Sequence, residues 1–261
     1  MLIIHASDFT GDDAAASLHA AALASRGARL ITLHTGPARP VGHDEHEPSP
    51  GATELAARWG RTIDHELVQI ASLADEISDG IADSLIEALR ELRPELIVVG
   101  THARRGIAAW IRSSISEAIA RNVAVPVLVV PNRARGFVDP RDGTVDLRRI
   151  VVPADHAEAA RRGAEAARWL AQLAGHAARA EDELVIVHAG APDPDLHRLG
   201  IPVLGIEGVL EDAIAEAARG RDACLIAMAT RGHDGIGDVF RGSHTERVIR
   251  EASCPVLSVP I

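Results

Sequence analysis

The sequence repeats itself, and this repeat is the strongest constraint on its fold. The block 100–126 recurs without a gap as 229–255, at an offset of 129 residues. Upstream, Asp8 corresponds to Asp155 at an offset of 147 residues, so the two copies differ in length between these landmarks. Two copies of one domain therefore account for nearly all of the 261 residues, and the chain is long enough for two hydrophobic cores.

Each copy alternates short apolar runs with helical patterns. In the first copy the apolar runs lie at 2–5, 30–34, 62–69, 95–100 and 125–130, and the helical patterns at 12–25, 52–60, 73–92 and 115–121. Strands that alternate with helices predict a parallel, doubly wound sheet with helices on both faces. We therefore predict an α/β fold of two tandem five-stranded sheets.

The copies are predicted to form two domains, residues 1–132 and 148–261. The segment 133–147 between them contains proline, glycine and alternating charges, and is predicted to be a surface linker. The second copy is 25 residues shorter between its second and fourth strands, because His34 and Gly100 lie 66 residues apart and their counterparts only 41. It should lack about one helix and a loop.

The composition excludes several function classes. The formal net charge of −10, with scattered arginines, argues against a nucleic-acid groove. All 27 basic residues are arginine, which excludes a lysine-containing phosphate loop and a Schiff-base lysine. No apolar run has membrane-spanning length and no signal segment is visible, so we expect a cytoplasmic protein. The run His43-Asp-Glu-His46 matches no zinc motif, and a solvated loop is the favoured interpretation.

A glycine-rich stretch near the C-terminus carries the strongest functional signal. An apolar run ends at Ala229, four glycines follow before Ser243, and a helical pattern begins there. Glycine lets the backbone approach a ligand closely, and the N–H groups at a helix start attract an anion. The stretch therefore suits phosphate, although an ordinary strand-to-helix turn has the same composition.

These features together resemble a tandem universal stress protein, with two copies of that family's domain. The family motif is Gly, two residues, Gly, nine residues, Gly, then Ser or Thr. The second copy matches three of the four positions, with Gly232, Gly242 and Ser243 present and Ala229 in place of the first glycine.

The first copy is degenerate by the same measure. It keeps Gly100 and Ser114 but has Ala103 and Ser113 at the two inner glycine positions. Two further marks of the family occur in both copies. They are an aspartate after the first strand, Asp8 and Asp155, and a histidine ending the second strand, followed by Thr35 or Ala189.

The resemblance implies an adenine-nucleotide site at the carboxyl ends of the strands in the second copy. Asp155 would face the ribose or base, Ala189 would offer its backbone to the adenine, and the glycine loop would line the phosphates. The implied site comprises Pro153, Ala154, Asp155, Ala189, Met228, Ala229, Arg231, Gly232, Arg241, Gly242, Ser243 and His244. Of these, Arg231 and Arg241 are included for charge complementarity, and solvated loop arginines are an equally good interpretation of both.

The corresponding positions of the first copy form a second-choice site. They are Asp8, Thr35, Val99, Gly100, Ala103, Ser113, Ser114 and Ile115. Because two glycines are replaced, Cβ atoms stand where a triphosphate needs close backbone approach. We expect weak nucleotide binding there, or none.

The resemblance also implies the strand order 3-2-1-4-5 in each copy, a Rossmann-like sheet of the adenine-nucleotide alpha-hydrolase type, and a pseudo-twofold axis where the last strands meet. The chain would be a pseudo-dimer, and a homodimer is a further expectation. The implied function is a regulatory or stress-response protein that binds ATP, with or without Mg²⁺, and is not an enzyme. The alternatives are a slow ATPase or nucleotidyl-transfer enzyme, and a binder of a small apolar or lipid-like ligand through the first copy.

Overall fold

The computed structural model describes residues 1–7, 13–35, 51–70, 89, 91–101, 125–132, 134–176, 182–190, 193–230, 247–249 and 251–261. The first half contains β1 (Leu2–Ser7), α1 (Ala14–Ala24), β2 (Arg29–Thr35), α2 (Ala52–Arg58), β3 (Asp64–Ile70), β4 (Leu96–Thr101) and β5 (Val127–Pro131). The second half contains β6 (Arg149–Pro153), α6 (Ala157–Leu173), β7 (Glu183–Ala189), α7 (Pro194–His197), β8 (Val203–Ile206), α8 (Leu210–Gly220), β9 (Leu225–Thr230) and β10 (Val256–Pro260).

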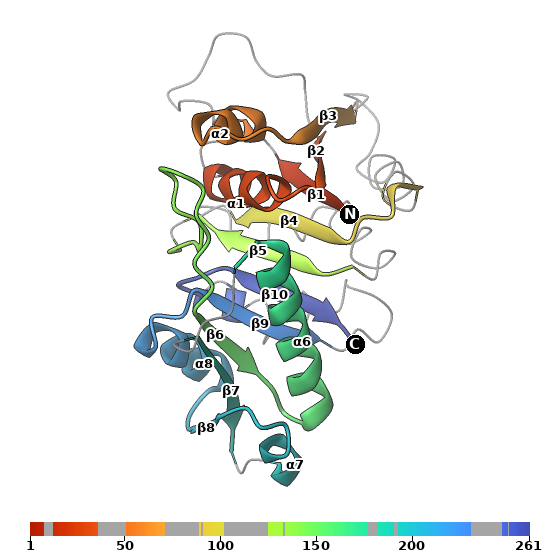
Figure 1. Cartoon of the computed structure of the whole chain (residues 1–261). Helices are drawn as coiled ribbons and strands as arrows, with labels where there is room; N and C mark the ends of the chain where they lie inside the picture. Colours follow the sequence, from red (N-terminus) through yellow and green to blue (C-terminus); the bar gives the residue numbers. More distant parts are fainter. Residues whose placement is uncertain are drawn as a thin grey trace.

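These strands form one continuous sheet in the order β3-β2-β1-β4-β5-β10-β9-β6-β7-β8 (Figure 1). Each half therefore has the expected order 3-2-1-4-5, and its own strands are parallel. The halves join where β5 and β10 pair antiparallel, with Val256 opposite Val129. Because of this antiparallel junction, the carboxyl ends of the strands point in opposite directions in the two halves.

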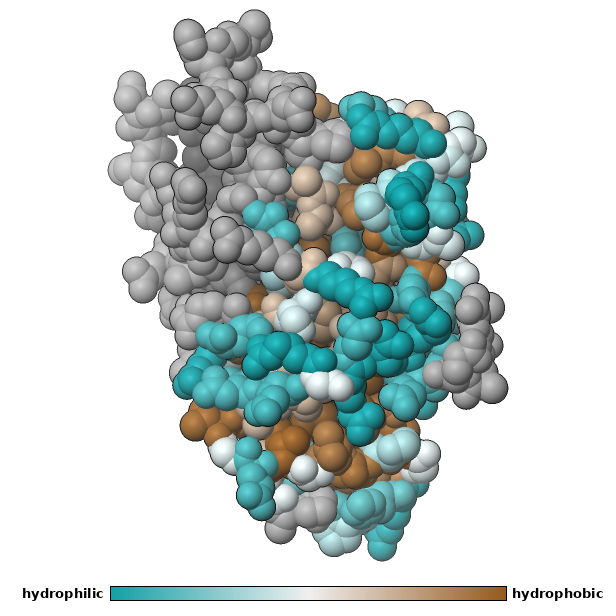
Figure 2. All heavy atoms as spheres, turned by 90° about the vertical axis from the view of Figure 1, so that its left-hand side faces the viewer, coloured by the Kyte–Doolittle hydropathy of each residue, from teal (hydrophilic) through white to brown (hydrophobic). Residues whose placement is uncertain are grey.

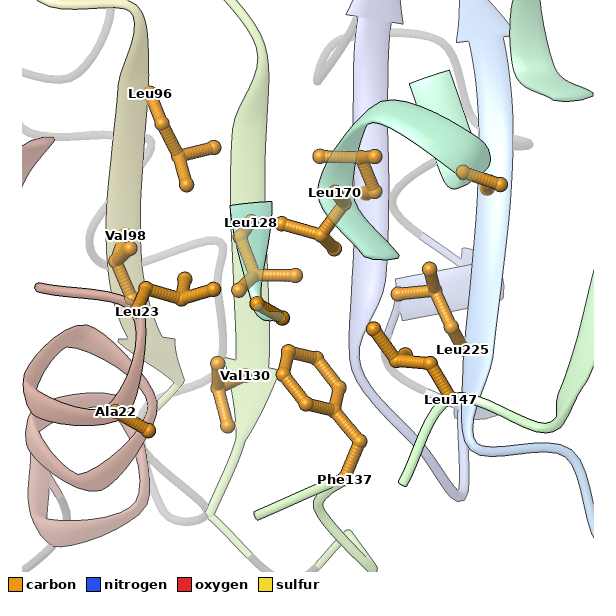
Figure 3. Close-up of a cluster of buried hydrophobic side chains, with 14 of the residues drawn as sticks. Ala22, Leu23, Leu96, Val98, Leu128, Val130, Phe137, Leu147, Leu170 and Leu225 are labelled. Carbon is orange, nitrogen blue, oxygen red and sulfur yellow. The ribbon is translucent and has the colours of Figure 1, made fainter. Parts of the chain in front are cut away.

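Helices cover both faces of the sheet, as the alternating pattern predicts. Side chains of alternate strand residues enter different cores: Ile3 packs in the cluster that contains residues of α1 and α6, and Ile4 in the cluster that contains residues of α8. The first cluster runs across the junction, where Leu128 of β5 lies near Phe137 and Leu170 (Figure 3). The two halves thus share one apolar layer.

The repeat is visible in the buried faces of α1 and α6. Five buried positions correspond at the offset of 147 residues: Asp13 with Ala160, Ala16 with Gly163, Ser17 with Ala164, Ala20 with Ala167, and Leu23 with Leu170. The buried His19, Ala21, Ala22 and Ala24 of α1 have no buried counterpart on α6. The two helices therefore lie on their sheets in the same register. This correspondence lets each residue of one half be compared with its counterpart in the other.

The second half is abbreviated where its sequence is short. In the described residues between β7 and β8 it has α7, four residues long, where the first half has the seven-residue α2 between β2 and β3, so this helix is shortened and not missing as expected. The third strand of the second half, β8, has four residues against the seven of β3.

The segment between β5 and β6, expected to be a surface linker, has exposed residues at 140–142 but is anchored in the core by three side chains. We call residues 134–147 the connector. Phe137, Val138 and Leu147 are each at most 6% exposed and belong to the same core cluster as α1 and α6. This anchoring was not predicted because these three side chains are scattered among charged residues, so no apolar period marks them. The domain boundaries at 132 and 148 remain a prediction.

His19 on α1 holds the connector in place. Its Nδ1 donates to the carbonyl of Ala15 at 2.7 Å, and its Nε2 accepts the backbone N–H of Phe137 at 3.2 Å. Burial lowers the pKa of His19 to about 4, so the ring is neutral and free to accept. On the outer side, Trp59 Nε1 donates to the carbonyl of Pro140 and Arg61 donates to that of Gly143.

The two cysteines, Cys224 and Cys254, directly precede the adjacent strands β9 and β10 or lie close before them. The β9–β10 register, in which Val256 lies opposite Ile226, extends back to place Cys254 opposite Cys224. Both are free thiols, and burial raises the pKa of Cys224 to about 11 and that of Cys254 to about 12. Thiolate formation is thus disfavoured at neutral pH.

Candidate functional site

The candidate site lies in the second half, at the carboxyl ends of the neighbouring strands β6 and β9. After β6 the chain crosses one face of the sheet, and it reaches β9 from the other face. Open α/β sheets bind ligands at such a reversal of strand order. We call the gap between the carboxyl ends of β6 and β9 the second-half crevice, and that between β1 and β4 the first-half crevice. The described residues at the edge of the second half are Pro153, Ala154, Asp155, Ala189, Met228 and Ala229.

The ladder between β6 and β9 stops early. Only Ile150 with Leu225 and Val151 with Ile226 are paired in these strands. In the first half the same ladder continues two residues further, through His5 with Val98 to Ala6 with Val99. The pairing of β6 with β9 therefore ends two residues deeper in the sheet than the pairing of β1 with β4.

Pro153 gives a physical reason for this difference. The carbonyl of Arg149 accepts from the N–H of Cys224, directly before β9, so the odd-numbered residues of β6 turn their backbone polar groups toward β9. Pro153 stands at the next such position and has no N–H to donate. Its counterpart Ala6 keeps one, and pairs with Val99.

Helix α6 lies close beneath the opened strands. A Cβ on Gly163 would stand 2.7 Å from Val152 Cγ1 and 2.9 Å from the carbonyl oxygen of Ala227. Both distances are too short for a real side chain, so glycine is required at this approach. The floor of the crevice is therefore a helix packed directly on β6 and β9.

The loop after β6 is tied to β7 by both polar groups of one residue. The N–H of Ala154 donates to the carbonyl of Val187 at 3.0 Å, and its carbonyl accepts from Nδ1 of His188 at 2.8 Å. His188 is 7% exposed. The next side chain, Asp155, is 80% exposed and lies 3.3 Å from Nε2 of His156. A fixed backbone thus presents a carboxylate that a ligand can reach.

Beyond Asp155, His156 begins α6. Its Nδ1 accepts the N–H of Ala159 at 3.2 Å, which caps the helix. At the far side of the crevice, Met228 is 8% exposed, and the Thr230 hydroxyl donates to the carbonyl of Val259 at 3.2 Å. The walls of the crevice are therefore a capped helix start and the fixed end of β9.

The remaining expected residues cannot be placed. Arg231, Gly232, Arg241, Gly242, Ser243 and His244 lie outside the described residues, as do Asp8, Ala103, Ser113, Ser114 and Ile115 of the first half. Of the second-choice site, Thr35 ends β2, and Val99 and Gly100 lie near the end of β4. The fold therefore brings the described members of each expected set to one edge of its half.

The first-half crevice contains a buried polar cluster that the sequence did not reveal. Asp13 Oδ1 lies 3.2 Å from His5 Nε2, and the Ser7 hydroxyl donates to Oδ2 at 2.5 Å. All three residues are at most 6% exposed. The same carboxylate approaches Gly100, where a Cβ would stand 3.1 Å from Oδ1. Gly100 thus makes room for Asp13.

The alternation of β1 was the signal that could have found this cluster. Ile3, His5 and Ser7 point to one face, and two of them are polar on a face that packs against a helix. A polar residue on a buried face needs a partner. Asp13, at the start of the following helix, is the partner of both in the structure.

Two further features of the described chain bear on function. No three histidine, cysteine, aspartate or glutamate side chains in the described part gather to hold a metal ion. No helix in the described ranges is long and apolar enough to cross a membrane.

A hollow of about 660 Å³ over the connector is a weaker candidate site. The side of the molecule on which it lies is hydrophilic across its middle (Figure 2). Its arginines are already neutralised, because Arg141 pairs with Asp139 and Arg148 with Asp146. It therefore offers an anion little uncompensated charge.

Known proteins with similar sequences and folds identify the family. The model of the Universal stress protein family matches residues 2–131 and 199–260. The universal stress protein in QAH/OAS sulfhydrylase 3'region of Thermus aquaticus is 34% identical over 141 residues, which are 43% of this chain and 98% of that protein. A universal stress protein from Archaeoglobus fulgidus DSM 4304 has a similar structure, with a TM-score of 0.64 at 19% identity, over 99% of this chain and 96% of that one.

A functionally unknown protein from Pseudomonas aeruginosa PAO1 shares the fold over 99% of this chain and 92% of its own, with a TM-score of 0.56 at 16% identity. These structures cover both halves at once, so the tandem arrangement is itself a shared fold. The family model covers more than half of the residues, in a segment of each half. The chain therefore belongs to the universal stress protein family, as a member with two domains in tandem.

Proposed function

We propose that this universal stress protein binds ATP, with or without Mg²⁺, in the second-half crevice, and that the bound nucleotide serves a regulatory role rather than a chemical one. The observation that carries the proposal is the early end of the β6–β9 ladder at Val151 and Ile226. The pairing of β6 with β9 thus ends next to the place where open α/β sheets hold their ligands. The first half, with the same topology, is paired two residues further.

The described residues suit the parts of a nucleotide that the family resemblance assigns to them. Asp155 is exposed on a backbone held by His188, so its carboxylate can accept from a ribose hydroxyl or a base amine. Ala189 and Ala229 are small residues near the ends of β7 and β9, so a nucleotide can come close to the backbone there. The glycine loop between Gly232 and Ser243, which follows β9 in the sequence, would bind the phosphates.

A regulatory role is preferred to catalysis because the described part of the crevice offers few groups for chemistry. His156 is engaged as the cap of α6, and Asp155 is exposed beside it. General acid–base catalysis needs a positioned base with a matched partner. An apolar ligand in the first half is disfavoured, because His5, Ser7 and Asp13 line that crevice with polar groups.

Two measurements test the proposal. The first is mass spectrometry of small molecules released by heat from the purified protein, in which ATP or ADP is the expected find. The second is calorimetric titration of ATP into the wild type and into Gly232→Val and Gly242→Val. We expect both substitutions to abolish binding, because a side chain there takes the space of a phosphate oxygen.

Gly100→Ala is the control in the first half. It adds a Cβ within 3.1 Å of Asp13, so its melting temperature is measured alongside. Loss of ATP binding in this variant, with the fold intact and with the second-half variants still binding, would place the site in the wrong half. Absence of any adenine nucleotide affinity in the wild type would reject the proposal outright.

A further inference from the structure

The buried carboxylate of Asp13 stands at the start of α1, directly over the end of β4. It lies 3.1 Å from the position that a Cβ would take on Gly100. The N-terminus of a helix attracts anions through its free N–H groups and its dipole. In the first half this position already holds a negative charge supplied by the chain itself.

Two neighbours from β1 stabilise that charge. The Ser7 hydroxyl donates to one carboxylate oxygen, and His5 Nε2 lies within hydrogen-bond distance of the other. These contacts also tie the start of α1 to β1, where β1 is still paired with β4 through Ala6 and Val99. The first-half crevice is therefore closed both by strand pairing and by a bound carboxylate.

The second half has apolar residues at all three positions. At the offset of 147 residues, His5, Ser7 and Asp13 correspond to Val152, Ala154 and Ala160. Val152 and Ala160 are fully buried in the core cluster beneath the second-half crevice. Ala229, the counterpart of Gly100, has a Cβ, which in the first half would stand only 3.1 Å from Oδ1 of Asp13 and would push against it. The four differences are thus physically linked.

We propose that Asp13 closes the first-half crevice to phosphates, and that its replacement by alanine at position 160 is what leaves the second-half crevice open to an anionic ligand. A phosphate brought to the helix start of the first half would meet a carboxylate of like charge in a poorly solvated place, where repulsion is strong. At the positions that correspond to Ser7 and Asp13 the second half has only methyl groups, and the carboxylates near the start of α6, Asp155 and Glu158, are exposed, so solvent weakens their repulsion. This inference rests on the proposed nucleotide site. It attributes the difference in phosphate binding between the two halves to the charge of Asp13.

The decisive experiment transplants the cluster into the second half. Val152→His, Ala154→Ser and Ala229→Gly supply the partners and the space, and Ala160→Asp or Ala160→Asn is then added to this same background. Aspartate and asparagine have nearly the same shape, so the two proteins differ in one charge. Calorimetry with ATP should show at least tenfold weaker binding in the aspartate version. Equal affinities, including equal loss of binding, would overturn the inference.

A second measurement does not depend on any nucleotide. Asp13→Ala removes the tie between α1 and β1, so hydrogen–deuterium exchange of the amides in β1 and β4 should accelerate at least tenfold. The β6 and β7 amides of the same sample are the internal control, and Glu165→Ala, which removes an exposed carboxylate from α6, is the matched variant. Unchanged exchange in β1 and β4 would overturn the closure. If the wild type binds no ATP, the proposed function fails while this readout still decides the role of Asp13.

Discussion

The two halves of this protein have the same strand order and the same helix register, yet their crevices differ. In the first half β1 and β4 stay paired to Ala6 and Val99, and a carboxylate fills the space above. In the second half the ladder stops at Val151 and Ile226. The comparison teaches that a duplicated fold can specialise through a few residues at its strand ends, without any change of topology.

The largest predicted difference between the halves appears on acidification. The pKa of His19 is about 4 in the folded chain, below its ordinary value of 6.5, because burial disfavours the charged ring. The contribution of neutral His19 to the unfolding free energy is fully present above pH 6.5. It is lost as the pH falls toward 4, because the unfolded chain binds the proton at a higher pH than the folded chain. A shift of that size corresponds to about 3 kcal/mol of unfolding free energy.

Urea unfolding of the wild type and of His19→Leu between pH 7.5 and pH 4 measures this loss. The variant should lose about 3 kcal/mol less than the wild type over the range. At pH 7.5 it should be less stable by about 1–3 kcal/mol, because the N–H of Phe137 loses its acceptor. If the unfolding free energies of the two proteins changed equally with pH, protonation of His19 would not be coupled to unfolding. The counterpart of His19 is Ala166, so no such step should arise there.

A smaller effect should follow from exchanging the residues at the ladder ends. Ala6→Pro removes the N–H that faces β4 and should lower the unfolding free energy by about 2 kcal/mol. Pro153→Ala restores an N–H facing β9 and should cost less than about 1 kcal/mol. Guanidinium unfolding of both variants checks the pair. Equal destabilisation would mean that the two ladder ends do not differ in hydrogen bonding.

The smallest effect concerns one hydroxyl group in the glycine loop of the second half. Ser243→Ala should weaken ATP binding about tenfold, since a hydrogen bond to a charged group contributes at least about 1.5 kcal/mol. The matched change Ser114→Ala should alter the affinity less than about twofold, because we place no nucleotide in the first half. Calorimetry on both variants decides this, and a larger effect at Ser114 would break the assignment of the site to the second half.

The fold could be predicted from the sequence because its signals are local. Apolar runs such as 30–34 and 95–100 are bounded by turns and helices, so their order along the chain restricts the topology. The expected meeting of the last strands is confirmed by the pairing of Val129 with Val256. The strand order came with the family resemblance. Residues 71–88 and 102–124, where most of two expected helices would lie, are outside the described chain.

The features that distinguish the halves could not be predicted in the same way, because they depend on contacts between distant residues. Asp13 looked like an ordinary helix-start residue, and only its contacts with His5 and Gly100 show where its carboxylate goes. Phe137 lies between charged residues, and its burial depends on a histidine 118 positions earlier. Neither contact produces a periodic pattern of apolar residues in the sequence from which it could be predicted.

The antiparallel pairing of β5 with β10 has one more consequence. An unpaired edge strand is a surface on which a second chain can add itself. Here each of these strands finds its partner within the same polypeptide, joined by a connector that is itself anchored in the core. Tethered segments meet at an effective concentration of millimolar order, whatever the abundance of the protein. The paired architecture of this chain is therefore insensitive to dilution, and its assembly follows from translation of a single message.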